Sequence, residues 1–267
     1  RIADEFDIDI RISKILVRNL DTKREMPTQS ILFSENDNAA FSEGIFTTEL
    51  NDIVENKDID LVVEVAGGID AAYEIIASSL KNSLPVVTAN KALLAEKGGE
   101  LYALANDNGV DLLFEAAVAG GIPVVRPLRE SLAVEHINSV QGILNGTTNF
   151  ILTQMTKNGT SYKDALSEAQ ALGYAEADPT ADVEGHDAAA KIAIISLLAT
   201  GTSASIKDVK CVGISNVSSD DIAAAKNLGY VIKLIATIEE KNEKEIFLRV
   251  EPTFVPNAHP FSTTNDG

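Results

Sequence analysis

Cysteine is nearly absent from this 267-residue sequence, which contains only Cys211. A single cysteine cannot form a disulfide within the chain, and it excludes zinc sites built from paired cysteines. The same scarcity favours a reducing compartment, so we expect a cytoplasmic protein. The three histidines, His136, His186 and His259, do not occur at the spacing of a metal-ligand pair, which argues against a histidine-based metal site.

Basic residues are also scarce, because 22 Lys and Arg stand against 40 Asp and Glu, giving a formal net charge of −18. Nucleic-acid binding depends on clustered basic side chains, so this balance argues against nucleic acid and against anionic membrane surfaces as partners. No apolar run reaches the roughly 18 residues that a membrane-spanning helix requires. Walker A and nucleophile-elbow motifs are missing as well. In contrast, 45% of the residues are hydrophobic, which suits a folded core.

The two ends of the sequence do not look like the start and close of a domain. The chain begins RIADEFDIDI, without a methionine, and stops at the turn-type residues STTNDG. We therefore interpret it as an internal piece of a longer protein. Its length suits two domains or one large one.

Short β-type runs alternate with helical patterns over residues 1–120. The pattern predicts strands at 8–17, 60–68, 85–90 and 111–121, and helices at 69–80 and 91–109, the second with a weak point at Gly98-Gly99. Buried-type strands with short connections predict a parallel sheet covered on both faces. We therefore expect an α/β, Rossmann-like nucleotide-binding domain over 1–120.

Residues 121–267 show a different pattern, in which strands come in pairs. Helices are predicted at 121–133, 145–159, 161–173, 187–201 and 218–229. Strands are predicted at 136–144, 230–240 and 245–255, and an acidic loop at 174–186. This arrangement predicts a second, α+β domain over 121–267 with an open, mostly antiparallel sheet.

Small and distinctive residues follow three of the predicted parallel strands, at Ala66-Gly67-Gly68, Ala89-Asn90-Lys91 and Ala117–Gly121. Ligands of open parallel sheets bind beyond the carboxyl ends of the strands, and glycine lets a ligand approach the backbone. Each segment alone would suit an ordinary turn, but three in succession favour a cofactor crevice. Lys91 begins a helix, where the macrodipole disfavours a cation. It is therefore either a functional lysine facing that crevice or a solvated surface lysine.

Arg18 follows the first predicted strand, with Lys23 and Arg24 close by. In dinucleotide-binding folds an acidic residue in this region favours NAD, whereas an arginine accommodates the 2′-phosphate of NADP. Arg18 therefore favours NADP, with NAD left open. The alternative is a basic surface loop without a cofactor role.

An acidic segment precedes the most apolar predicted helix and contains Glu176, Asp178, Asp182, Glu184 and Asp187. Asp187 and Lys191 are four residues apart and share one helical face. Lys191 enters the run IAIISLLA, and a partly buried lysine needs a carboxylate or lowers its pKa, as catalytic lysines do. Carboxylates beside a crevice would also suit the ammonium group of an amino-acid substrate. The alternative is a surface salt bridge next to a solvated loop.

The chain resembles homoserine dehydrogenase over most of its length. The matching motifs are VVEVAGG, VTANKALLA, FEAAVAGGIPVV, GILNGTTNFIL, ALGYAEADPTADVEGHDAAAK and the IKL of YVIKLIA. The resemblance implies an NAD(P)-dependent oxidoreductase that interconverts L-aspartate 4-semialdehyde and L-homoserine in threonine, methionine and isoleucine biosynthesis. It also implies a homodimer in which the second domain binds the substrate and forms the dimer contact.

The resemblance assigns expected roles to individual side chains. Lys191 matches the proton-donating lysine, and Lys91 matches the second active-site lysine, near nicotinamide and substrate. Glu176 and Asp187 match substrate-binding carboxylates, and Asp182 belongs to the same group.

Further positions match the surroundings of the family's active site. Gly173 and Glu176 match positions near the cofactor, beside the strand-end residues Gly67, Gly68 and Asn90. Residues 145–148 match a loop bordering the active site and the dimer region. A monovalent cation such as sodium is expected at a site formed by the Glu115 carboxylate and backbone carbonyls of Val118, Gly120 and Ile122.

One departure from the family concerns the cofactor's pyrophosphate. The family opens with a strand and a G-x-G-x-x-G loop, whereas this sequence lacks that motif and Arg1 matches the following helix. The family also continues beyond Gly267. The isolated chain is therefore expected to bind NADP poorly, because the helix N-terminus that holds pyrophosphate is missing. Two alternatives stay open: another Rossmann-type amino-acid or semialdehyde dehydrogenase, and a non-catalytic cofactor-binding regulatory protein.

Overall fold

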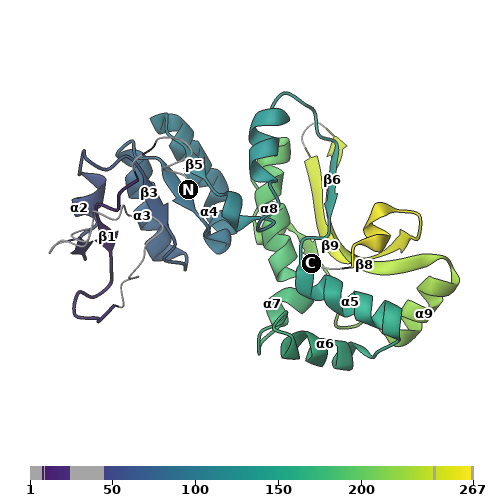
Figure 1. Ribbon diagram of the computed structural model, residues 1–267. Coiled ribbons are helices and arrows are strands. Elements are labelled where there is room, and N and C mark those ends of the chain that lie inside the picture. Colours follow the sequence, from purple (N-terminus) through teal and green to yellow (C-terminus); the bar gives the residue numbers. More distant parts are fainter. Residues whose placement is uncertain (1–7, 9, 25–44, 243–244, 266–267) are drawn as a thin grey trace.

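The computed structural model describes residues 8, 10–24, 45–242 and 245–265. Two groups of elements lie side by side in Figure 1: a purple and blue group with parallel strands, and a teal to yellow group around longer strands. Among the described helices, none combines the length and the apolar character that crossing a membrane would require.

The strands of the first group are parallel and short. β1 (Ile15–Leu16) pairs with β2 (Phe46–Thr47), and a second sheet has the order β3-β4-β5, formed by Val62–Glu64, Val86–Thr88 and Leu112–Leu113. Parallel neighbours need crossover connections, and in the β3-β4-β5 sheet these are helices. These are α3 (Asp70–Lys81) and α4 (Lys91–Asn108), while α2 (Asn51–Val54) precedes β3. The predicted alternation of strands and helices is thus confirmed.

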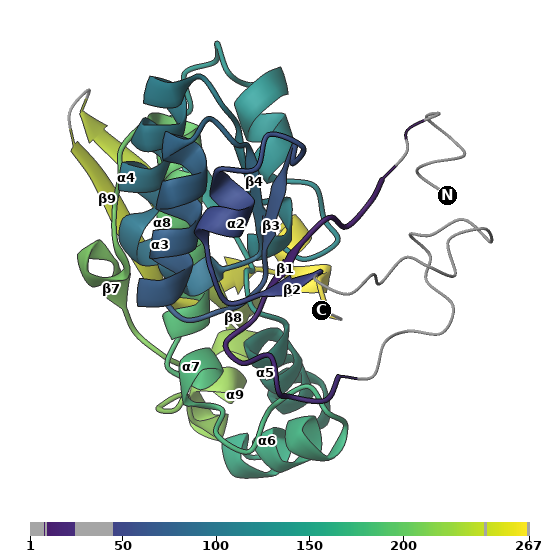
Figure 2. The ribbon, with the colours of Figure 1, turned by 90° about the vertical axis from the view of Figure 1, so that its left-hand side faces the viewer.

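The β3-β4-β5 sheet is covered on one face by the described residues. Val62, Val86 and Leu112 are buried against α3 and α4, which lie on the same side of the strands in Figure 2. On the other face Val63 is 61% and Val65 76% exposed. The expected cover of the second face is therefore not found within the described part of the chain.

The strand predicted at 8–17 is much shorter in the structure. Only Ile15 and Leu16 are in a strand, and residue 9 lies outside the described residues. The backbone N–H groups of Ile15 and Val17 donate to the carbonyls of Ile45 and Thr47, both at 2.8 Å. Alternating polarity is not enough to form a strand, because each residue also needs a paired neighbour.

α4 runs without a break through the predicted weak point at Gly98-Gly99 and ends at Gly109, which adopts the left-handed conformation with φ +66°. A Cβ on Gly99 would overlap the Ser203 side chain, whereas one on Gly98 would come no closer than 3.9 Å to a neighbour. Gly99 therefore permits a close approach between α4 and the segment after α8 rather than interrupting the helix.

The second group contains a four-stranded sheet with the order β6-β8-β9-β7. Its strands are Ser139–Gly142, Tyr230–Asn242, Glu245–Pro256 and Lys210–Cys211, in the same order. β8 pairs antiparallel with β6 and β9, and β7 pairs parallel with β9. The predicted α+β region with a mostly antiparallel sheet is therefore confirmed.

The helices of this group begin and end close to their predicted bounds. They are α5 (Gly146–Asn158), α6 (Tyr162–Ala171), α7 (Thr180–Val183), α8 (His186–Thr200) and α9 (Ser219–Asn227), with short helical turns η1 (Glu115–Ala117), η2 (Pro127–Ser131), η3 (Ile206–Asp208) and η4 (Pro260–Thr263). Three predictions need correction. The strand predicted at 111–121 is limited to β5, because the helical turn η1 follows it at Glu115–Ala117. The loop at 174–186 contains α7, and the helix predicted at 121–133 is helical only over 125–131. It starts late because Pro123 precedes it and the Glu115 carboxylate accepts the N–H groups of residues 124–126.

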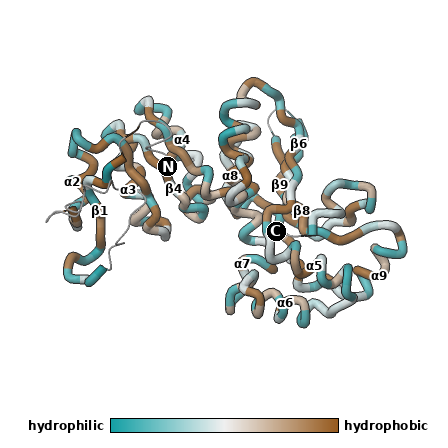
Figure 3. Tube along the Cα trace, viewed as in Figure 1, coloured by the Kyte–Doolittle hydropathy of each residue, from teal (hydrophilic) through white to brown (hydrophobic). Residues whose placement is uncertain are grey.

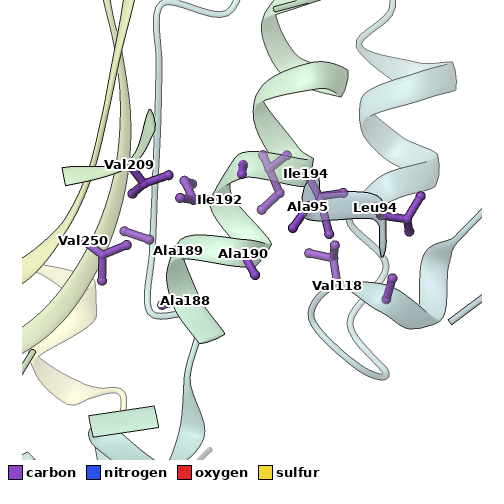
Figure 4. Packing of buried hydrophobic residues seen from close by; sticks show 14 of the residues in the cluster. Leu94, Ala95, Val118, Ala188, Ala189, Ala190, Ile192, Ile194, Val209 and Val250 are labelled. Atoms are coloured by element: carbon purple, nitrogen blue, oxygen red, sulfur yellow. The ribbon is translucent and has the colours of Figure 1, made fainter. Parts of the chain in front are cut away.

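α8 lies at the junction of the two groups and is buried on nearly all sides. Figure 4 shows its residues Ala188–Ala190, Ile192 and Ile194 between Val250 and Val209 on one side and Leu94, Ala95 and Val118 on the other. Figure 3 shows hydrophobic stretches along β8 and β9 and hydrophilic ones on the outer loops. α8 also packs against α4, and a hydrogen bond from Lys91 to Asp187 joins the first turns of these two helices.

Candidate active site

A cleft of about 460 Å³ opens where the first turns of α4 and α8 meet the acidic segment after α6. Apolar residues line part of it, including Ile69, Ala95 and Ile206. Its charged and titratable lining residues come from three segments and are Lys91, Glu96, Glu176, Asp178, Asp182, His186 and Asp187. The cleft is therefore rich in carboxylates, with a lysine on the α4 side.

Asn90 fixes the start of α4 and with it the position of Lys91. Its Oδ1 accepts the N–H of Leu93 at 3.1 Å, and its Nδ2 donates to the Gly68 carbonyl at 2.7 Å. Its backbone N–H donates to Thr88 Oγ1 at 3.0 Å. Asn90 is a helix cap and also a link between the loops that follow β3 and β4. Lys91 therefore enters the cleft from a well-anchored turn.

Glu64, at the end of β3, is a carboxylate for which the sequence predicts no role. It is 2% exposed, and its oxygens accept the N–H groups of Ala66 and Gly67, at 2.8 and 3.1 Å, and the Thr88 hydroxyl at 2.6 Å. A buried carboxylate is tolerated only with such partners. The available signal was an acidic residue inside the apolar run VVEVAGG. Glu64 holds the Gly67-Gly68 loop and the β4 end together.

Asp187 is the centre of the cluster and lies in the first turn of α8. Its carboxylate accepts hydrogen bonds from Lys91 Nζ, from Lys191 Nζ at 2.6 Å and from Asn145 Nδ2 at 2.9 Å. Burial alone would raise the pKa of Asp187, but the hydrogen bonds from Asn145, Lys191 and Lys91 outweigh it and hold this pKa below its ordinary value. Asp187 is thus an ionised carboxylate between two ammonium groups.

Lys191 pairs with Asp187 one turn earlier, as the four-residue spacing predicts. Its ammonium also donates to the Leu144 carbonyl at 2.7 Å, and its side chain is 19% exposed. The side chain of Lys91 is 36% exposed. The expected partial burial of Lys191 is confirmed. The two lysines approach one carboxylate from different helices.

The other acidic residues of the segment lie in different settings. Asp182 is tied to the cluster through Asn145 Nδ2, at 2.7 Å, whereas Glu176 is exposed at the rim of the cleft. The Asp178 carboxylate accepts the hydroxyl and N–H of Thr180, which lower its pKa. Glu184 accepts the Ser215 hydroxyl and is not among the residues that line the cleft.

Two further predicted positions, Arg18 and Gly173, lie apart from the cluster. Arg18 is exposed just after β1, and neither Arg18 nor Gly173 lines the cleft. Gly173 follows α6 with φ +80°, a conformation that favours glycine. The Lys191–Asp187–Lys91 cluster therefore brings together some of the predicted residues, while Arg18 and Gly173 stay predictions as cofactor contacts.

The predicted cation site contains a carboxylate that already has partners. Glu115 accepts the backbone N–H groups of Val124, Val125 and Arg126 at 2.7, 3.0 and 2.8 Å. Burial raises the pKa of Glu115, and these hydrogen bonds bring it below its ordinary value. Among the described residues no group of three His, Cys, Asp or Glu is placed to hold a metal ion. A site built mainly from the carbonyls of Val118, Gly120 and Ile122 stays a prediction.

Comparison with known proteins gives one consistent result. The family model described as homoserine dehydrogenase matches residues 123–267, and that of the homoserine dehydrogenase NAD-binding domain matches 1–115. Homoserine dehydrogenase of Bacillus subtilis is 43% identical over 266 residues, covering 100% of this chain and 58% of that protein. That of Corynebacterium glutamicum is 52% identical over 225 residues, covering 83% and 51%.

Solved structures agree with the sequence relatives. The homoserine dehydrogenase from Thiobacillus denitrificans superposes with a TM-score of 0.80 at 41% identity, covering 96% of this chain and 56% of the other. A hyperthermophilic archaeal homoserine dehydrogenase in complex with NADPH gives 0.66 at 29% identity, covering 79% and 61%. The chain spans little more than half the length of these relatives. With its motifs, its fold and both family models in agreement, the chain belongs to the homoserine dehydrogenase family.

Proposed function

We propose that the protein interconverts L-aspartate 4-semialdehyde and L-homoserine, with NADP or NAD as the hydride carrier. The observation that carries the proposal is the Asp187 carboxylate held between Lys91 and Lys191 in a carboxylate-rich cleft. Family membership supports the same reaction. The biosynthesis of threonine, methionine and isoleucine is the expected context.

The residues at the carboxyl ends of β3 and β4 fit one part of a dinucleotide. Gly67 and Gly68 have φ of +72° and +75°, and a Cβ on either would meet no atom within 4 Å, so a ligand can approach this backbone. Asn90 and Lys91 lie beside them. A bound nicotinamide would supply the hydride for the aldehyde carbon or accept it from homoserine. Arg18 is the candidate for the 2′-phosphate of NADP, and the archaeal relative described with NADPH supports that cofactor.

The carboxylates give the cleft its expected selectivity for an amino-acid substrate. Glu176 and Asp187, with Asp182 beside them, would bind the substrate ammonium group and thereby orient the carbonyl. These side chains come from the loop before α7, from α7 itself and from the first turn of α8. A neutral aldehyde without an ammonium group would lack this anchor.

The lysines supply the charge that the carbonyl oxygen needs during reduction. Negative charge develops on that oxygen, and an ammonium group can stabilise it and deliver a proton. Lys191 is the proposed proton donor in reduction and the acceptor in oxidation, and Lys91 is the second cation. Asp187 and the Leu144 carbonyl fix the Lys191 ammonium in place.

Homoserine oxidation by the full protein, followed as NADPH formation, tests this proposal. Preference for homoserine within a panel of amino alcohols and hydroxy acids would support it. Preference for another member of the panel would assign a different dehydrogenase of this type. Cofactor binding without turnover of any substrate would assign a regulatory protein.

Several properties of the whole protein belong to the same proposal. A division near residue 120 is supported by the two family models, which match 1–115 and 123–267. The homodimer is supported by family membership alone, and so is the cation at Glu115, Val118, Gly120 and Ile122. The cytoplasmic location is supported by the single cysteine.

A further inference from the structure

Both the oxygen and the nitrogen of the Asn145 side-chain amide form hydrogen bonds. Its Oδ1 accepts the N–H of Thr148 at 2.8 Å and the Thr148 hydroxyl at 3.0 Å, which caps α5. Its Nδ2 donates to Asp182 Oδ1 at 2.7 Å and to Asp187 Oδ2 at 2.9 Å. A primary amide has two donor hydrogens and two acceptor sites, so this 5% exposed side chain is fully satisfied.

The two carboxylates bridged by this amide belong to different helices, α7 and α8. Carboxylates brought this close repel each other, and an N–H donated to each offsets that repulsion. The preceding residue contributes as well, because the Leu144 carbonyl accepts the Lys191 ammonium. One short segment before α5 therefore holds both members of the Asp187–Lys191 pair.

The cap of α5 does not by itself require asparagine. Serine and aspartate cap helices about as well, since either offers an oxygen to the N–H groups of the first turn. Neither can donate two N–H groups to two carboxylates. The choice of asparagine here therefore reflects the carboxylates rather than the helix cap.

We propose that Asn145 is a positioning residue of the active site, whose amide holds Asp182 and Asp187 at a fixed separation and turns Asp187 toward Lys91 and Lys191. It acts through Asp187 rather than on the reacting atoms. The catalytic part of this inference rests on the proposed function, whereas the effect on Asp187 itself does not.

Two variants that keep the helix cap test the proposal, Asn145→Ser and Asn145→Asp. Loss of the amide donors raises the pKa of Asp187, so the acidic limb of the kcat/KM profile for homoserine moves to higher pH. We expect kcat/KM to fall roughly tenfold to a hundredfold, with the KM for homoserine rising more than that for the cofactor. Asn145→Asp adds a third carboxylate and has the larger effect.

Ser218→Ala is the matched control, because Ser218 caps α9 by accepting the Asp221 N–H at 3.1 Å and takes no part in the cluster. It lowers Tm by a similar mechanism but leaves the pH profile and the KM values unchanged. An Asn145→Ser protein with the wild-type pH profile and KM values would overturn the proposal.

The pH dependence of Tm provides a readout without activity. Asp187 has a lowered pKa in the fold, so its stabilising contribution is present above its unfolded value and is lost on acidification. The Tm difference between wild type and Asn145→Ser is therefore wide near neutral pH and narrows as the pH falls below about 4. A Tm difference that stays constant with pH would refute the role of Asn145. If the wild type fails to oxidise homoserine, the proposed function falls, and this comparison still decides the role of Asn145.

Discussion

Two carboxylates, Glu64 at the end of β3 and Asp187 in the cleft, are 2% and 10% exposed and are satisfied in different ways. On the sheet side Glu64 accepts two backbone N–H groups and a hydroxyl, all neutral donors. On the helix side Asp187 accepts two lysine ammoniums and one amide. Neutral backbone donors fix a loop, whereas ammonium groups hold protons that can be transferred. The comparison assigns support of the backbone to Glu64 and charge chemistry to the cluster around Asp187.

The largest effect is expected from Lys191→Ala, which removes the proposed proton donor from the helix side. We expect kcat to fall by roughly two to four orders of magnitude with little change in NADP affinity, because general acid catalysis contributes about that much. Steady-state kinetics and cofactor titration measure the two quantities. Lys226→Ala, on α9, is the control, and near-normal turnover by Lys191→Ala would contradict the assignment.

Asp187→Asn tests whether the negative charge of Asp187 stabilises the fold, because the substitution removes that charge and keeps the size of the side chain. Both lysines lose their anionic partner, and we expect a loss of roughly 1–3 kcal/mol in the free energy of unfolding near pH 7. Since the pKa of Asp187 is lowered in the fold, its contribution is complete above the unfolded pKa and disappears as pH falls through the folded one. Denaturant titrations at several pH values should show the two proteins converging below about pH 4. A gap independent of pH would show that the ion pairs do not stabilise the protein.

Glu64→Gln changes the sheet side with almost no change in size. The amide replaces the oxygen that accepts the Thr88 hydroxyl with an NH2 group, so the negative charge is lost and the hydroxyl has to accept a hydrogen bond where it now donates one. We expect about 2 kcal/mol of destabilisation and weaker cofactor binding, with the KM for homoserine less affected than the cofactor KM. A larger rise in the KM for homoserine than in the cofactor KM would contradict the separate roles assigned to Glu64 and to the cluster around Asp187. Glu74→Gln, on α3, serves as a control for the loss of one negative charge.

The smallest effect concerns the docking of α4, which carries Lys91. Gly99→Ala should destabilise by about 1 kcal/mol, because the new methyl group overlaps the Ser203 side chain and only part of this cost is offset by helix propensity. Gly98→Ala meets no such contact and should be neutral or stabilising. Thermal unfolding of both variants measures the difference. Equal Tm values would show that α4 does not depend on this close approach.

The helices could be predicted from short-range sequence patterns. The predictions that need correction concern segments whose structure depends on a hydrogen-bond partner elsewhere in the chain. Asn90, Asn145, Ser161 and Ser218 cap the helices that their sequence context predicts. The strand at 8–17 was predicted too long because alternation does not reveal which residues find a pairing neighbour. The helix predicted from residue 121 begins only at residue 125. The N–H groups of residues 124–126 donate to the Glu115 carboxylate, and no sequence pattern shows that contact.

The candidate site could be predicted only in part. The Asp187–Lys191 pair follows from a four-residue spacing on one helix, and the importance of Lys91 was suggested by its place after a strand. The role of Glu64 could not be read from the sequence, because a single acidic residue in an apolar run does not indicate which donors surround it. The hydrogen bonds from Asn145 to Asp182 and Asp187 could not be predicted either, because these partners are 37 and 42 residues away in the sequence.

The order of helices and strands and the membership of a family could be predicted from the sequence, because they depend on short-range patterns and on motifs. Which charged side chains meet depends on the packing of the folded chain. Lys91 and Asp187 are 96 residues apart and meet because α8 packs against α4. Such contacts depend on packing between distant segments, and the pKa of Asp187 is lowered only once Asn145, Lys191 and Lys91 have been brought to its carboxylate.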